Sequence, residues 1–218
     1  GVRVYGLWGF PAAATWAHAD FALRPRMADH VAMTIKKITT HAVALPFEMG
    51  APKPLFAGRP REQTILFIRV ETDAGLVGWG EAFGFAVWPA TRTAIDELIA
   101  PNAIGRDERD IAKLMLELTR TLHLLGRTGP VVYALSGLDI ALWDLAGKAA
   151  GVPLATLLGG AKRDSLAAYA SLIRYSDPAL AARNAARAAA EGYRAIKLHE
   201  ITVAAVRARQ DRHQVATV

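Results

Sequence analysis

The chain has 218 residues, of which 52% are hydrophobic and 21% charged, and its formal net charge is +6 at pH 7. No apolar run approaches the ~20 residues of a membrane-spanning helix, and the absence of cysteine excludes disulfides, thiol catalysis and thiolate metal sites. The basic residues are scattered, which argues against a nucleic-acid-binding surface. We therefore expect a cytoplasmic globular protein that binds neither nucleic acid nor membrane and buries a core in one large or two small domains.

Residues 1–32 differ from the rest of the chain, because Gly, Ala, Trp and Pro are mixed there without helical or strand period. One interpretation is an export signal, with Arg3 ahead of an apolar segment over 4–17. Glycine and proline interrupt that segment, which favours an extension upstream of a start at Met27 or Met33. We expect this part to be unstructured or to be a mis-assigned extension.

The pattern becomes regular from Thr34 and predicts three strands, over 34–45, 64–72 and 76–81. The turn sequence at 73–75 joins the second strand to the third, and antiparallel pairing follows from so short a connection. One face of the second strand carries three apolar residues: Leu66, Ile68 and Val70. Four prolines and two glycines make 46–61 an irregular segment, and residues 82–89 form a second one.

Two helices follow. Asp107 is a plausible N-cap for the first, because apolar residues recur at helical spacing over 111–125. Residues 130–150 form the second, which starts with proline and is followed by glycine. Asp139 and Asp144 lie there among small and apolar residues, where buried acids need partners. Capping or ion pairing inside a helix bundle is favoured over catalysis for both.

The last part of the pattern is a strand over 166–172, a helix over 179–191 and a strand over 193–198. A crossover of this length predicts a right-handed βαβ unit with parallel strands. Lys197 and His199 lie two residues apart where the second strand ends, so their side chains project to the same face. The sequence therefore predicts a cation and a proton acceptor side by side at the carboxyl end of a strand.

The helix sequence Ala-Leu-Ser-Gly-Leu-Asp-Ile-Ala-Leu-Trp-Asp-Leu-Ala-Gly-Lys at 134–148, continued through 152–160, resembles the signature of the mandelate racemase and muconate-lactonizing branch of the enolase superfamily. Gly-Trp-Gly-Glu-Ala at 78–82 is similar to the end of that branch's N-terminal hairpin, and 192–197 is similar to its second barrel strand. The resemblance covers about 33–200 in the right order.

The resemblance implies an α+β capping domain, made of a three-stranded antiparallel sheet and a helix bundle, followed by the first βαβ part of an incomplete TIM-type barrel. We expect the capping domain at 33–160 and the start of the barrel at 161–218. Residues 46–61 and 82–92 match the positions of the family's two substrate-specificity loops.

Members of this branch abstract the proton next to a substrate carboxylate and stabilise the enediolate on Mg²⁺, as racemases, cycloisomerases or acid-sugar dehydratases. Lys197 and His199 fall on the family's Lys-x-Lys position. The resemblance implies that Lys197 neutralises the carboxylate and that the second residue is the base. Many relatives have lysine there; an unperturbed histidine titrates near ~6.5 and lysine near ~10.4. Histidine can therefore exchange a proton at neutral pH, which favours dehydration over two-base racemisation.

The three acidic metal ligands of the family lie at the ends of the third, fourth and fifth barrel strands. The only acid after Glu200 is Asp211, and a complete barrel takes ~250 residues. We therefore expect no metal ligands and no bound Mg²⁺ in this chain, which would be a truncated and catalytically silent member. A complete enzyme would act on a small carboxylate and form a homo-oligomer. The alternative is a non-catalytic cap-domain module for dimerisation or interaction.

Overall fold

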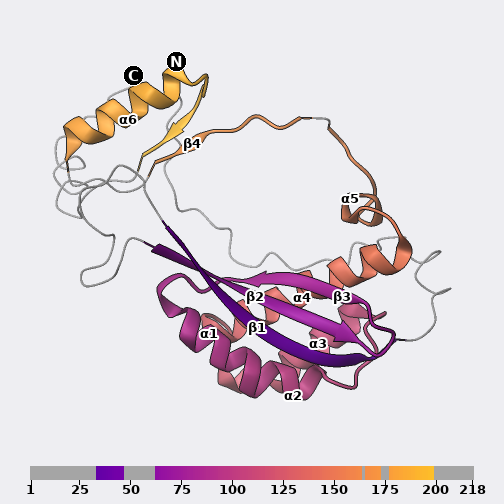
Figure 1. Cartoon of the computed structure of the whole chain (residues 1–218). Coiled ribbons are helices and arrows are strands. Elements are labelled where there is room, and N and C mark those ends of the chain that lie inside the picture. Colours follow the sequence, from indigo (N-terminus) through magenta and orange to yellow (C-terminus); the bar gives the residue numbers. More distant parts are fainter. Residues whose placement is uncertain (1–32, 47–61, 164, 173–176, 199–218) are drawn as a thin grey trace. The chain divides into compact units, whose positions relative to one another are not determined.

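The structure is a computed structural model that describes residues 33–46, 62–163, 165–172 and 177–198 (Figure 1). They divide into two compact units: residues 33–46 and 63–162 form the first, and residues 163, 165–172 and 177–198, together with Glu62, belong to the second. The domain boundaries expected from the sequence stay a prediction. The expected extension over 1–32 and the first predicted specificity loop, except Pro46, lie outside the described residues.

A three-stranded sheet in the order β1-β2-β3 forms the first unit's framework. Its strands are β1 (Ile35–Pro46), β2 (Glu62–Thr72) and β3 (Val77–Ala82). β2 and β3 pair antiparallel, with Leu66 opposite Ala82. The predicted antiparallel sheet is confirmed. Of the two faces of β2, the one that carries Leu66, Ile68 and Val70 is buried, with each residue 0% exposed.

The longer helices of this unit lie against one face of the sheet, and the short α5 lies beyond the end of α4 (Figure 1). In chain order they are η1 (Phe85–Val87), α1 (Trp88–Ala94), η2 (Ile95–Ile99), α2 (Ala100–Ala103), α3 (Ile111–Thr121), η3 (His123–Leu125), α4 (Pro130–Ala150) and α5 (Leu154–Leu157). α4 has the predicted bounds, because Pro130 suits the first turn and Gly151 ends the helix in a left-handed conformation. This sheet and its helices confirm the α+β fold class.

α4 packs closely on β3. A Cβ atom on Gly80 would overlap the carbonyl oxygen of Gly137, and one on Gly78 would overlap that of Ala141. Only glycine leaves room for the helix backbone at these two strand positions. Gly137 of α4 likewise has no room for a Cβ, which would lie 2.7 Å from the Cβ of Ala82, so glycines on both elements allow the close approach of helix and sheet.

The predicted N-cap at Asp107 is wrong. Asp110 caps α3, and its side chain accepts a hydrogen bond from the backbone N–H of Lys113 at 3.0 Å. Asp107 instead accepts from the backbone N–H and guanidinium of Arg109. The helix also ends before Leu125, which is 55% exposed in η3.

The segment over 82–89, predicted to be irregular, is largely helical, because η1 covers Phe85–Val87 and α1 follows it directly. α1 begins at Trp88, and Pro89 occupies its first turn. Proline is favoured there because its nitrogen needs no hydrogen-bond partner. The expectation of an irregular segment is therefore wrong from Phe85 onwards.

The second unit is a small βαβ unit. It contains β4 (Ala170–Ser171), α6 (Pro178–Ala190) and β5 (Ile196–Lys197). β4 and β5 pair in parallel, as predicted, although both are shorter than expected. Asp177 caps α6 by accepting from the backbone N–H of Ala179 at 2.8 Å, and Gly192 follows the helix with a positive φ of 96°.

Candidate functional site

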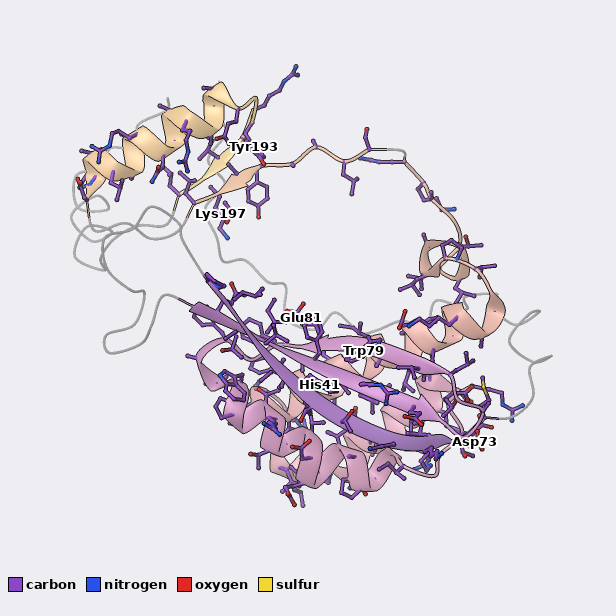
Figure 2. The ribbon with its side chains drawn as sticks, in the orientation of Figure 1. His41, Asp73, Trp79, Glu81, Tyr193 and Lys197 are labelled. Atoms are coloured by element: carbon purple, nitrogen blue, oxygen red, sulfur yellow. The ribbon has the colours of Figure 1, made fainter. Side chains whose placement is uncertain are left out.

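Lys197 is the last residue of β5, and its side chain is half-buried (Figure 2). It lies opposite Ser171 of β4, and its carbonyl accepts a hydrogen bond from the backbone N–H of Leu172 at 3.0 Å. Lys197 thus stands at the carboxyl end of a parallel strand pair, where the sites of α/β sheets form. No carboxylate of the described residues pairs with its ammonium group, so its charge can meet an anionic ligand.

His199 lies outside the described residues. Its predicted place beside Lys197, and the assignment of the two as cation and base, stay predictions. The structure describes only β5, the strand that ends at Lys197.

Metal binding finds no support in the described residues. Over the four described ranges, no group of three or more His, Cys, Asp or Glu side chains is placed to hold a metal ion. The Mg²⁺ that the family resemblance implies therefore has no set of ligands among the described residues. In the part of the chain that the structure describes, no helix is long and apolar enough to cross a membrane.

Asp144 of α4 forms a hydrogen bond with the backbone of β3, the strand at one edge of the sheet. Its Oδ2 accepts from the backbone N–H of Trp79 at 2.8 Å and from Lys148 Nζ at 2.6 Å. Lys148 Nζ also donates to the carbonyl of Val77 at 2.9 Å. Because β3 is an edge strand, these two side chains satisfy backbone groups that a further strand would otherwise pair. The ion pairing predicted for Asp144 is confirmed, and its role is structural.

Asp139 behaves differently. It is half-buried, and desolvation raises the pKa of its carboxyl above the ordinary value. Among the described residues no hydrogen bond or ion pair joins Asp139 to another residue, so its predicted capping or pairing stays a prediction.

Replacing Asp144 with alanine is expected to lower the free energy of unfolding by about 1–3 kcal/mol, because the N–H of Trp79 loses its acceptor. Asp144→Asn keeps an acceptor and should cost less. Arg92→Ala is the control, since it breaks an exposed helix pair worth about 0.5 kcal/mol. Urea unfolding followed by circular dichroism measures all three. Equal losses for Asp144→Ala and Arg92→Ala would show that the edge contacts contribute nothing.

Sequence reasoning missed how the segment after β3 is anchored. The ring of Phe83 meets that of Tyr133 edge-on, with centroids 4.9 Å apart. The hydroxyl of Thr91 donates to the carbonyl of Phe83 at 3.2 Å. These contacts fix the start of the predicted second specificity loop to α4 and α1. An aromatic residue directly after a strand was the available signal.

Fold and site together define a class of protein: an α+β capping unit followed by the first strands of a parallel α/β barrel, with a lysine at a strand's carboxyl end. The family described as mandelate racemase / muconate lactonizing enzyme, N-terminal domain, matches residues 37–159, which is more than half of the chain. The chain belongs to this family.

Curated relatives include acid-sugar enzymes. A D-galactonate dehydratase family member of Catenulispora acidiphila is 41% identical over 64% of this chain and 32% of its own length. A D-galactarolactone cycloisomerase of Agrobacterium fabrum is 34% identical over 76% of this chain and 44% of its own. The match thus spans less than half of each of these relatives.

Solved structures agree with the fold. A member of the enolase superfamily from Agrobacterium tumefaciens has a TM-score of 0.67 at 29% identity and covers 83% of this chain and 52% of its own. A mandelate racemase/muconate lactonizing protein from Paracoccus denitrificans, complexed with magnesium, has a TM-score of 0.60 at 33% identity over 76% of this chain and 42% of its own. An enolase from Pantoea ananatis with bound D-gluconate and magnesium has a TM-score of 0.59 at 32% identity over 77% and 36%.

Proposed function

We propose that this chain supplies the capping domain and the first barrel strands of a cytoplasmic enzyme that removes the proton next to the carboxylate of an acid sugar, and that dehydration follows. The observation that carries the proposal is the position of Lys197 at the carboxyl end of β5 in a chain of this family. The relatives named as acid-sugar dehydratases and a cycloisomerase support the substrate class.

In this proposal Lys197 neutralises the substrate carboxylate, which makes the neighbouring proton more acidic. His199 takes that proton, or as a cation gives one to the leaving hydroxyl. The described residues offer no cluster of acidic metal ligands. Since a developing enediolate needs an electrophile, the 218-residue polypeptide by itself is proposed to be silent.

The first test uses the chain as it stands. The purified polypeptide is incubated in deuterium oxide with Mg²⁺ and either D-gluconate or D-galactonate, and the α-position is followed by proton NMR. We expect no exchange. Exchange at a rate above a boiled sample would contradict the silence of this chain.

A chimera tests the roles of the two site residues. Residues 1–200 are joined to the remaining barrel of the Agrobacterium cycloisomerase, and α-proton exchange is measured with Mg²⁺ present. His199→Asn is expected to lower exchange by about 10²–10⁴-fold, with Mg²⁺ affinity unchanged. Arg194→Met, which removes an exposed charge from the same unit, is the control. Unchanged exchange in His199→Asn would remove this residue from catalysis.

A further inference from the structure

Residues 105–108, between α2 and α3, pair with residues 33–35 at the start of β1. Three backbone hydrogen bonds join the two segments: from the N–H of Ile35 to the carbonyl of Arg106 at 3.0 Å, from that of Gly105 to Ile35 at 2.8 Å, and from that of Glu108 to Met33 at 3.4 Å. The bridge between Thr34 and Asp107 within this pairing is antiparallel. We call the two paired segments the β1 latch.

Glu108 is a buried acid within this latch. The residue is 6% exposed, and its side-chain Oε2 has no hydrogen-bond partner among the described residues. A neutral acid fits such a position better than a carboxylate, because an unpaired buried charge costs much more than an unpaired buried polar group. Neither the packing of the cap nor the proposed chemistry uses this carboxyl group.

Two charged neighbours act on the Glu108 carboxyl in opposite directions. Burial raises the pKa of Glu108 to about 7, and the negative charge of Asp107 and a hydrogen bond between the two side chains add to that shift. Arg109 opposes the shift, but Asp107 pairs with its guanidinium. Ionised Glu108 would therefore lie beside the carboxylate of Asp107, in a place that favours the neutral acid.

The charged groups of the surrounding elements already have partners. Asp73, in the turn after β2, accepts from the backbone N–H and the hydroxyl of Thr34 at 3.0 and 2.7 Å, and Figure 2 labels it. Arg106 pairs with Glu117 of α3, and Asp110 caps that helix. These contacts do not involve the Glu108 carboxyl, so they persist when it ionises and confine the effect to the latch.

We propose that the β1 latch is a pH-sensitive switch, closed while Glu108 is protonated and opened locally when Glu108 ionises. In the closed state the neutral acid lies against the carboxylate of Asp107. Loss of the proton places two negative charges together in a poorly hydrated position, where their repulsion is least screened. Residues 105–108 then separate from residues 33–35, and water reaches both carboxylates. The charge on one buried group thus biases a local two-state element.

This opening is separate from unfolding of the whole unit. Most of the core lies outside the latch, in the buried face of β2 and in the close contact of Gly80 with Gly137 of α4. Segments with few buried contacts open at a lower free energy than the core that they adjoin. Amides of the latch therefore report on the switch, and amides of the β2–β3 pair report on the whole unit. The inference does not depend on the proposed enzymatic function.

Hydrogen–deuterium exchange of the full chain, followed by NMR from about pH 5 to about pH 8, tests the switch. Protection factors are compared, because they remove the direct effect of pH on exchange. The amides of Gly105 and Glu108 are expected to lose protection by about 10-fold or more across this range. Low urea should leave their exchange at the upper pH unchanged, because a local opening exposes little surface.

The amides of Ile68 and Gly80, which pair within the β2–β3 hairpin, are the internal reference. They open with the whole unit, so urea should accelerate their exchange. Constant protection of Gly105 and Glu108 over the pH series would overturn the proposal. So would a urea response at the upper pH equal to that of the reference amides, because the latch would then open only when the unit unfolds.

Glu108→Gln separates the switch from other titrations. The glutamine stays neutral, so the amide of Gly105 should keep its protection at the upper pH. Glu97→Gln, at an exposed position of η2, is the matched control and should behave as the wild type. Melting curves verify that both variants fold, and the wild-type series is a complete test if one does not. Loss of protection in Glu108→Gln equal to that of the wild type would show that another group opens the latch.

Discussion

Alanine at Gly80 is expected to destabilise the cap unit by about 3 kcal/mol or more, the upper range for overpacking a core. Its Cβ would overlap the carbonyl oxygen of Gly137 and lie 2.8 Å from the amide nitrogen of Ala141. Both are backbone atoms of α4 and cannot rotate away. The helix and the strand must therefore separate, which exposes their shared core. Urea unfolding followed by far-ultraviolet circular dichroism measures the loss.

Gly105→Ala is the control for Gly80→Ala. Gly105 has a φ of 82°, and nothing lies within 4 Å of the position of its Cβ. Alanine at this position is expected to destabilise the unit only through its left-handed backbone conformation, by about 1–2 kcal/mol. A loss at Gly80 no larger than the loss at Gly105 would mean that β3 shifts easily on α4, and that the contact is looser than the structure shows.

Local signals in the sequence predicted the elements whose ends are fixed locally. The apolar residues over 64–72 identified β2, and the structure buries the face with Leu66, Ile68 and Val70. Pro130 and Gly151 identified both ends of α4, because proline and glycine act through their own backbone geometry. In each case the residue type that predicts the element also determines its backbone conformation or its burial.

Contacts with distant partners were not predicted. Asp107 and Asp110 are equally good cap residues by type. Asp107 does not cap α3, because its side chain pairs with Arg109 and its backbone forms a β-bridge with Thr34. Asp144 accepts from Trp79, which is 65 residues away. No pattern within a helix predicts such a contact, because a distant strand supplies the donor.

The candidate site was predictable in part. The spacing of strand, helix and strand placed Lys197 at the carboxyl end of a parallel strand, and the structure agrees. His199 follows outside the described residues, so the pair rests on the sequence alone. The short paired length of β4 and β5 was not predictable, since strand ends depend on neighbouring strands rather than on their own residues.

Glu108 is expected to make the stability of the cap unit fall as the pH rises from about 4.5 to about 7. The residue is 6% exposed, and its Oε2 has no hydrogen-bond partner among the described residues. Burial, followed by the charge of Asp107, raises the pKa of Glu108 from 4.5 to about 7. Arg109 is the facing cation and opposes this shift, but Asp107 engages its guanidinium.

The sign follows from the protons bound in each state. Between the two pKa values the folded chain keeps a proton on Glu108 that the unfolded chain has lost, so raising the pH favours unfolding. At about 1.4 kcal/mol per pKa unit, the loss across this window is about 3 kcal/mol. The pKa of Asp107 is lowered to about 2, chiefly by its hydrogen bond with Arg109, so this carboxylate stays ionised throughout the window and adds no slope.

Glu108→Gln separates this effect from every other titration in the chain. Glutamine has nearly the same shape and stays neutral, so the free energy of unfolding should lose most of its decline across the window and exceed that of the wild type at neutral pH. Glu97→Gln, at an exposed position of η2, should keep the decline. Urea unfolding at several pH values measures both variants. A decline that persists in Glu108→Gln would assign it to another group, because the buried carboxyl is then absent.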